Sequence, residues 1–238
     1  MSGLDLEAPS RSQVEKAGKR LRKIFRGELP GGELRACLEI IERHRQTHTG
    51  PMLNANNGMR RYAQAAGVGV QVTQRLKRME TIVAKLTDYE SKMNLSRMRD
   101  IGGVRLVVDT LNELRSLQAK VVEKRRRYGV EVIDYVAQPK RSGYRAVHLV
   151  CTYSSRGVAR PVEVQLRTRA MHAWADMVEQ VSSSLGVNHK KEGYTPFHRW
   201  ALLWSRRVEA VELGQPSPVT DADFKRAWDR MLEGWQAR

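Results

Sequence analysis

The chain has 238 residues, 41% of them hydrophobic, so it can bury one substantial core with helical additions. It has no apolar run of about 18 residues and no signal-peptide pattern at its start, so we expect a cytoplasmic protein without a membrane segment. Its two cysteines, Cys37 and Cys151, lie far apart in amphipathic or apolar stretches. This spacing argues against a disulfide framework or a zinc site and favours two core thiols.

The formal net charge is +16, from 42 Lys and Arg residues against 26 Asp and Glu residues. This excess is larger than solubility requires, and it predicts a polyanion nearby, such as nucleotide phosphates, RNA or an acidic protein. A basic surface that is only solvated is the simpler alternative.

The first part of the chain predicts a series of helices. Apolar residues recur at helical spacing over residues 10–26, 33–45 and 52–66, with glycine and proline between these segments. His44 and His48 are one helical turn apart, as two metal ligands could be. Because no third ligand lies near them, we prefer to interpret them as a solvated helix end.

The same spacing predicts another helix over residues 72–86, with apolar residues on its buried face. Its other face presents cations in approximate register, which could grip a polyphosphate. A solvated polar face is the alternative interpretation. These cations are Arg75, Lys77, Arg78 and Lys85.

A buried strand is predicted over residues 101–107, with Asp100 at its entrance and two glycines that permit close approach. A long amphipathic helix should follow over residues 110–127. Three more strands come next, and a tight turn joins the last two into an antiparallel hairpin. These strands are residues 130–137, 145–153 and 159–168.

The last predicted strand has one apolar face and one polar face, and the polar face carries Glu163, Gln165 and Arg167. Glu163 could simply be one of the solvent-facing polar residues of an alternating strand. If it lies across the sheet from Asp100, however, the two carboxylates would form a magnesium site.

A basic turn, residues 139–143, separates two of these strands and presents Lys140 and then Tyr144. A phosphate could meet the lysine while a base stacks on the tyrosine ring. An ordinary hairpin turn is the alternative. His148, in the next strand, has either a direct role or the role of a histidine satisfied within the sheet.

Four stretches together resemble the synthetase domain of the RelA/SpoT family of alarmone synthetases. In chain order they are RLKRMETIVAKL, RMRDIGGVRLVVD, DYVAQPKRSGYRAVH and VEVQLRTRAMHAWA, within residues 72–176. The resemblance implies an α+β fold, a mixed β-sheet of nucleotidyltransferase type flanked by helices. It also implies a small member with a helical N-terminal region (1–70), a synthetase core (71–188) and a helical C-terminal region (189–238).

The activity implied by this resemblance is Mg²⁺-dependent transfer of pyrophosphate from ATP to the 3′-hydroxyl of GDP or GTP, which makes (p)ppGpp. Asp100 and Glu163 match the family's magnesium-holding catalytic carboxylates, and Glu163 would also help to deprotonate the acceptor. The residues matching the ATP-binding set are Arg75, Lys77, Lys85 and Arg105. Those matching the acceptor-binding set are Lys140, Tyr144, which would stack on guanine, His148, Gln165 and Arg167.

The chain departs from the family after MHAWAD, where Glu179 and Gln180 replace a Glu-His pair. Residues 131–134 match neither the acidic nor the basic version of a motif that differs among long members, so the acceptor stays open. A second hypothesis is a toxic small alarmone synthetase that pyrophosphorylates the 3′ end of tRNA. A third is a non-catalytic nucleotide or RNA sensor, which the retained carboxylates argue against. Phosphate contacts for tRNA would come from residues 10–26, 124–127 and 190–207.

Residues 195–238 predict two helices separated by a Pro-Ser-Pro linker, each with aromatic residues every three or four positions. Such stripes usually cover a core. A surface for self-association or for an antitoxin protein is the sharper alternative. The aromatic residues are Phe197, Trp200, Trp204, Phe224, Trp228 and Trp235.

Overall fold

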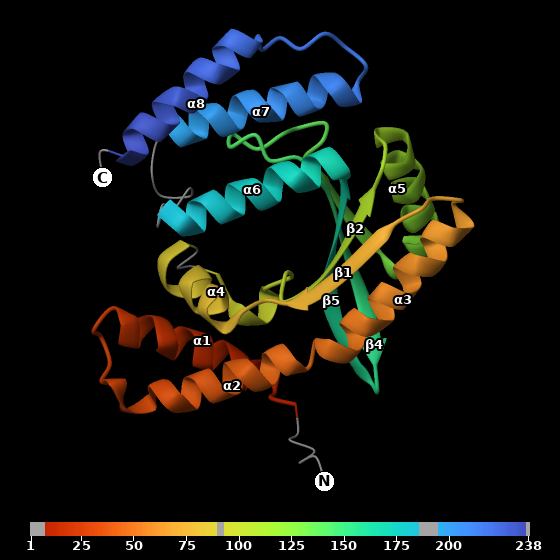
Figure 1. Cartoon of the computed structure of the whole chain (residues 1–238). Helices are drawn as coiled ribbons and strands as arrows, with labels where there is room; N and C mark the ends of the chain where they lie inside the picture. Colours follow the sequence, from red (N-terminus) through yellow and green to blue (C-terminus); the bar gives the residue numbers. More distant parts are fainter. Residues whose placement is uncertain (1–7, 90–92, 186–194, 237–238) are drawn as a thin grey trace, which may run out of the picture.

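The structure is a computed structural model that describes residues 8–89, 93–185 and 195–236. A five-stranded mixed sheet lies at its centre and helices pack around it (Figure 1). This confirms the predicted α+β fold. The boundaries of the three predicted regions stay predictions.

The sheet has the strand order β1-β2-β5-β4-β3. Strands β2 and β5 pair in parallel, and the other neighbours pair antiparallel. The predicted hairpin between β4 and β5 is confirmed, and its two turn residues, Arg156 and Gly157, both have positive φ, as a tight type I′ turn requires. The strands are β1 Gln71–Leu76, β2 Gly102–Val108, β3 Val130–Asp134, β4 Val147–Ser155 and β5 Val158–Thr168.

Helices α3 and α5 cover one face of the sheet, while α6, α7 and α8 stack beyond the other (Figure 1). Helices α1, α2 and α4 form a separate group around a second apolar cluster. The helices are α1 Arg11–Phe25, α2 Leu34–Gln46, α3 Thr49–Ala65, α4 Met79–Ala84, α5 Leu111–Arg125, α6 Arg169–Leu185, α7 Pro196–Glu212 and α8 Asp221–Gln236. No helix in the described ranges combines the length and the apolar character that a bilayer crossing needs.

Side-chain alternation gives the two faces of the sheet different roles. On β2 and β5, Val104, Val164 and Leu166 are buried against α3 and α5 in the main core. The residues between them, including Arg105 and Glu163, point to the opposite face. The core therefore fixes the register of the sheet and thereby aligns a row of polar side chains on its other side.

Helix α5 begins where the sequence predicts because a capping box fixes its start. The Thr110 hydroxyl accepts from the Glu113 amide, and the Glu113 carboxylate accepts from the Thr110 amide. This cap comes directly after β2 and directs the chain over the sheet face.

The predicted helix over residues 72–86 is wrong in its first half. Residues 71–76 form β1, and only the second half is helical, as α4. Val72 and Leu76 are four residues apart, which is one helical turn but also two strand repeats, so the pattern fits both structures. Pairing with β2, where Arg75 lies opposite Gly103, decides for the strand.

The expected solvated helix end at His44 and His48 is also wrong. Helix α3 already begins at Thr49, so the chain turns directly from α2 into α3 and Pro51 lies in the first helical turn. Both histidines are buried in this corner, with 7% and 1% of their surface exposed. Their rings meet edge to face, with 5.0 Å between centroids.

The two cysteines are buried free thiols, as expected. The C-terminal aromatic stripes largely form a third apolar cluster, in which Trp174 of α6 packs with Phe197 and Trp200 of α7. This confirms their interpretation as core cover, although Trp228 remains 40% exposed. The side chain of Trp235 and residues 190–194 of the predicted basic segment lie outside the described residues.

Candidate active site

A polar cavity of about 230 Å³ opens on the face of the sheet opposite α3 and α5. It is lined by residues of β1, β2 and β5, by Lys77 directly after β1 and by Asp100 two residues before β2. Six of the predicted site residues line it, from both halves of the predicted site. They are Arg75, Lys77, Asp100, Arg105, Glu163 and Gln165.

Asp100 lies between two lysines. Its Oδ2 is 2.9 Å from the Lys77 Nζ and 3.2 Å from the Lys85 Nζ. The backbone fixes this contact, because Lys77 follows β1 and its amide donates to the Ile101 carbonyl next to Asp100. Burial opposes ionisation of Asp100, but the charges and hydrogen bonds of the two lysines outweigh it and hold its pKa below the ordinary value.

The other carboxylate oxygen of Asp100, Oδ1, is buried and has no hydrogen-bond partner. An unpaired anionic oxygen beside a second carboxylate, Glu163, suits a hard divalent cation such as Mg²⁺. Water and substrate phosphates usually supply the remaining ligands of such an ion. In the described part of the chain, no group of three or more His, Cys, Asp or Glu side chains is arranged to hold a metal. The two carboxylates therefore fit the ion if water and substrate phosphates complete its coordination.

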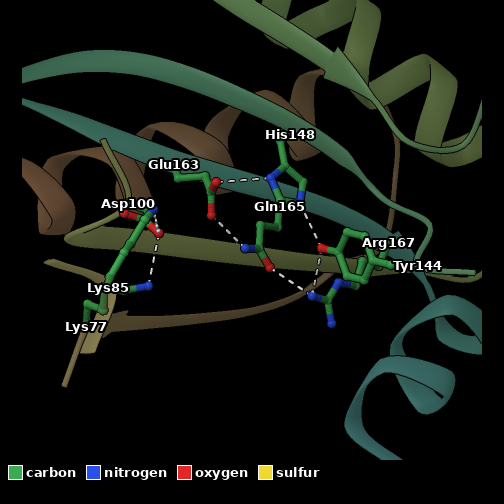
Figure 2. Close-up of polar contacts among 8 residues, drawn as sticks. All are labelled: Lys77, Lys85, Asp100, Tyr144, His148, Glu163, Gln165 and Arg167. Atoms are coloured by element: carbon green, nitrogen blue, oxygen red, sulfur yellow. Dashed lines mark hydrogen bonds and ion pairs between the residues drawn. The ribbon is translucent and has the colours of Figure 1, made fainter. Parts of the chain in front are cut away.

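Glu163 belongs to a closed ring of hydrogen bonds, which Figure 2 shows on the same side of the sheet as Asp100. The ring passes through His148, Tyr144, Arg167 and Gln165. Its distances are 3.0 Å from Glu163 Oε1 to His148 Nδ1, 2.7 Å from His148 Nε2 to the Tyr144 hydroxyl, 3.0 Å from that hydroxyl to Arg167 Nη2, 3.0 Å from Arg167 Nη2 to Gln165 Oε1 and 2.7 Å from Gln165 Nε2 to Glu163 Oε2.

The donors of this ring all point toward Glu163. Arg167 donates to the Tyr144 hydroxyl and to the Gln165 carbonyl, since a guanidinium can only donate. The His148 ring contacts the Tyr144 hydroxyl through Nε2 and donates from Nδ1 to the Glu163 carboxylate, since an ionised carboxylate can only accept. Each group is satisfied in one consistent pattern that ends on the ionised Glu163.

This pattern explains the ionisation of Glu163, whose side chain is 19% exposed. Burial and the charge of Asp100 oppose ionisation, but the hydrogen bond and the charge of His148, together with the hydrogen bond from Gln165, outweigh them and lower the pKa of Glu163. The effect of the Asp100 charge also means that the two carboxylates interact, as a pair sharing one cavity must.

Arg75 and Arg105 form the side of the cavity nearest α6. The Arg105 guanidinium is 3.5 Å from the carboxylate of Asp176, and the Arg75 guanidinium is 3.9 Å from that of Glu179. Both acids belong to α6, whereas both arginines belong to the sheet. Burial and the nearby charge of Arg167 lower the pKa of Arg105, so a negative ligand between these groups would be stabilised. Glu179, which lies in the segment where the sequence departs from the family pattern, is therefore opposite a predicted ATP-binding arginine.

Tyr144 is half-buried, with cations near its ring. Lys140 Nζ lies 5.1 Å and Arg167 Cζ 5.2 Å from the ring centroid. A flat ligand stacking on Tyr144 would compete with these cations for the ring. Together with the ring of hydrogen bonds, this places all the predicted site residues in one continuous region.

Sequence reasoning missed several neighbours of this region. Tyr135 packs its ring 5.1 Å from His148 and lies 4.4 Å from Lys140 Nζ, and Trp174 packs against Tyr144. Tyr135 and Trp174 both lie within the stretches that carry the family resemblance, so that resemblance could have pointed to them. Their contacts depend on the register between β3 and β4 and on α6 docking, which local spacing does not specify.

Part of the basic surface predicted for tRNA is not available. Arg125, in the basic run 124–127, is buried and lies over the ring of Tyr153, with 4.1 Å between Cζ and the centroid.

Within residues 131–134, Glu131 pairs with Arg99, and Asp134 pairs with Arg115 and also accepts from two backbone amides. Both acids are therefore engaged by other residues of the chain.

Comparison with known proteins links this geometry to a family. Residues 74–190 match the region found in RelA / SpoT proteins. The GTP pyrophosphokinase YjbM of Bacillus subtilis is 29% identical over 145 residues, which cover 59% of this chain and 65% of that protein. The GTP pyrophosphokinase of Escherichia coli K12 is 31% identical over 178 residues, 75% of this chain but 20% of that protein.

Solved structures share the fold. The small alarmone synthetase 1 of Bacillus subtilis matches with a TM-score of 0.60 at 20% identity, covering 79% of this chain and 96% of that one. The same protein bound to its product pppGpp matches with a TM-score of 0.57 at 22% identity, covering 73% and 94%. At these sequence identities the structural similarity shows a shared fold. The chain spans about two thirds of the length of YjbM and about one fifth of the length of the Escherichia coli enzyme.

Proposed function

Because this chain belongs to the RelA/SpoT family, we propose that it transfers pyrophosphate from ATP to the 3′-hydroxyl of a guanine nucleotide, GDP or GTP. The observation that carries the proposal is the convergence of Asp100 and Glu163 on one cavity lined by cations, beside a tyrosine ring that is suited to a base. The pyrophosphokinase relatives and the structural neighbour bound to pppGpp support it.

In this proposal the cations of the cavity bind ATP. Arg75 and Arg105 flank the adenine, and Lys77 and Lys85 neutralise its phosphates. Since both lysines already contact Asp100, an arriving triphosphate would draw them away and release the carboxylate. Asp100 and Glu163 would then hold Mg²⁺, which supplies charge neutralisation and orients the transferred group.

The acceptor would lie on the side of Tyr144, with its base on the tyrosine ring and Lys140 and Arg167 near its phosphates. The acceptor 3′-oxygen forms a bond to the β-phosphorus of ATP, the bond from that phosphorus to the α-phosphate oxygen breaks, and AMP leaves. Glu163, held ionised by His148 and Gln165, accepts a hydrogen bond from the hydroxyl and orients it. The hydroxyl proton goes to this carboxylate or to water.

A radioactive transfer assay tests the proposal. ATP labelled in the β-phosphate is incubated with the protein, Mg²⁺ and either GDP, GTP or deacylated tRNA. We expect label on a guanine nucleotide, and we expect Asp100→Asn and Glu163→Gln each to reduce the rate at least about a hundredfold. Asp109→Asn, which changes a carboxylate paired with Arg169 outside the cavity, should keep the wild-type rate.

Other outcomes identify the alternatives. Label on tRNA alone, with a steep loss of activity as salt rises, would replace the guanine acceptor with the tRNA branch. If the carboxylate variants keep the protein's effect in cells, the enzyme hypothesis is wrong and a nucleotide or RNA sensor becomes the better interpretation.

A further inference from the structure

The turn that carries Tyr144 is attached to the C-terminal helix α7 on both sides of this residue. Ser205 of α7 donates from its hydroxyl to the Gly143 carbonyl over 2.5 Å, and the same hydroxyl accepts from Arg145 Nε over 3.3 Å. Gly143 and Arg145 are the chain neighbours of Tyr144. One buried serine, 3% exposed, therefore fixes the backbone before and after the tyrosine.

Arg145 extends this attachment. Its side chain is almost fully buried and makes contacts in three directions, to Ser205, to the Val136 carbonyl at 3.1 Å and to Glu209 of α7 at 2.6 Å. A buried guanidinium is stable only when it is paired and hydrogen-bonded, so these contacts are costly to break. They tie the end of β3, the turn and α7 into one unit.

Packing leaves little freedom at this contact. Gly143 has φ +87°, and a Cβ on it would lie 2.9 Å from the Ser205 Cβ, so the turn touches α7 directly. Helix α7 is in turn anchored to α6, where the Trp174 indole donates to the Ala201 carbonyl over 2.7 Å. Trp174 also packs against the Tyr144 ring.

The attachment concerns one half of the site only. The residues that line the cavity around Asp100 come from β1, β2, β5 and their ends, and none belongs to α7. Ser205 also lies beyond residues 74–190, the part of the chain that matches the family region. Helix α7 therefore contacts the acceptor turn and contributes no residue to the lining of the cavity around Asp100.

We propose that α7 is a positioning element of the acceptor subsite, with Ser205, Arg145 and Glu209 as the positioning residues that hold Tyr144 and Lys140 for the guanine nucleotide. This inference rests on the proposed function for its substrate. Its structural content, that α7 immobilises the turn, does not depend on which acceptor is used.

The variant Ser205→Ala removes the hydroxyl at almost constant volume. We expect the KM for the guanine acceptor to rise about tenfold and the KM for ATP to stay within about twofold, since one buried hydrogen-bond centre is lost on one side of the site. Asp221→Asn is the matched control, because Asp221 of α8 pairs with Arg207 of α7, away from the acceptor turn. It should leave both KM values unchanged.

Hydrogen exchange gives a readout that needs no activity. In Ser205→Ala the amides of Gly143 and Tyr144 should exchange about tenfold faster than in the wild type, and those of β2 should not change. Equal shifts in both KM values, unchanged exchange at the turn, or the same effects in Asp221→Asn would each overturn the inference. If the wild type labels no guanine nucleotide, the proposed function fails, and the exchange result still decides whether α7 holds the turn.

Discussion

Asp100 and Glu163 carry the same charge but are held ionised by different means. Asp100 is stabilised by two ammonium groups, Lys77 and Lys85, whereas Glu163 is stabilised by hydrogen bonds from a histidine and an amide. The lysines are long and can follow a phosphate, so the environment of Asp100 can change when a nucleotide binds. The ring around Glu163 is built on strands β4 and β5, except for Tyr144, which lies in the turn before β4.

The Tyr144 hydroxyl links the acceptor side to Glu163, and Tyr144→Phe tests this link. The variant keeps the ring but removes the hydroxyl that contacts His148 Nε2 and accepts from Arg167. We expect kcat to fall about tenfold, because His148 loses the partner that orients it toward Glu163, while the KM for the acceptor changes little. Steady-state kinetics with each nucleotide varied in turn measures both values.

Tyr144→Ala is the companion variant, since it also removes the ring. It should raise the acceptor KM well beyond the value for Tyr144→Phe. If Tyr144→Phe instead raises the acceptor KM and spares kcat, the hydroxyl contacts the ligand directly and does not act through His148.

At the scale of single residues, the sequence predicts which side chains lie near one another but not which hydrogen bonds they form. The alternation of Glu163, Gln165 and Arg167 places them on one strand face from sequence alone. The closure of the ring depends on His148 lying opposite Gln165, a register that the β4–β5 turn and the buried face set together. The orphaned oxygen of Asp100 likewise results from packing, which motif spacing does not contain.

At the scale of elements, short apolar repeats are ambiguous and long ones are not. The amphipathic helices α1, α2 and α5 extend over many residues and were predicted within a few residues of their observed ends. Strand β1 is short, and its apolar spacing fits a helix equally well, so only its pairing with β2 identifies it. The attachment of α7 to the acceptor turn is a contact between residues about 60 positions apart, which no local pattern encodes.

The contact between the acceptor turn and α7 can be tested on stability with two glycines. Gly143 and Gly157 both have positive φ, +87° and +76°, so alanine strains the backbone at either position. A Cβ at Gly157 meets nothing within 4 Å, whereas one at Gly143 meets Ser205. Gly143→Ala should therefore lower the free energy of unfolding by about 1–2 kcal/mol more than Gly157→Ala.

Urea unfolding of both variants and of the wild type measures this difference. Equal losses in the two variants would mean that the turn and α7 separate easily, which contradicts the close packing described above. Gly143→Ala should also raise the KM for the acceptor, and Gly157→Ala should not.

At the scale of the whole molecule, three separate apolar clusters stabilise three parts of the described structure. The central cluster packs helices against the sheet, and the C-terminal cluster packs α6, α7 and α8 together behind the acceptor turn. The N-terminal cluster packs α1 and α2 against α4. Lys85, which contacts Asp100, directly follows α4. The corner between α2 and α3 joins the N-terminal helices to the sheet. Two buried histidines lie in this corner, so its stability should depend on pH.

Burial, with smaller contributions from the charges of His48 and Arg160, lowers the pKa of His44 to about 3. Burial also lowers the pKa of His48 to about 4, although its hydrogen bonds to backbone groups oppose the shift. A histidine whose pKa is lower in the folded state binds its proton more readily when the protein is unfolded. Its contribution to stability is therefore complete above about pH 6.5 and is lost as the pH falls toward the folded pKa. With both groups titrating, the free energy of unfolding should fall by about 2 kcal/mol per pH unit near pH 5.

The variant His44→Leu separates this effect from the general loss of stability in acid. His44 Nδ1 has no hydrogen-bond partner, whereas His48 Nδ1 contacts the His44 carbonyl, so leucine at position 44 removes a titrating group without breaking a bond at that atom. The stability of the variant should be close to wild type at pH 7 and should fall about half as steeply between pH 6 and pH 5. Urea unfolding at each pH measures both slopes, and the titration of carboxylates cancels because it is common to the two proteins. A variant that follows the wild-type slope would show that His44 is protonated in the folded protein, and hence that the corner between α2 and α3 admits water.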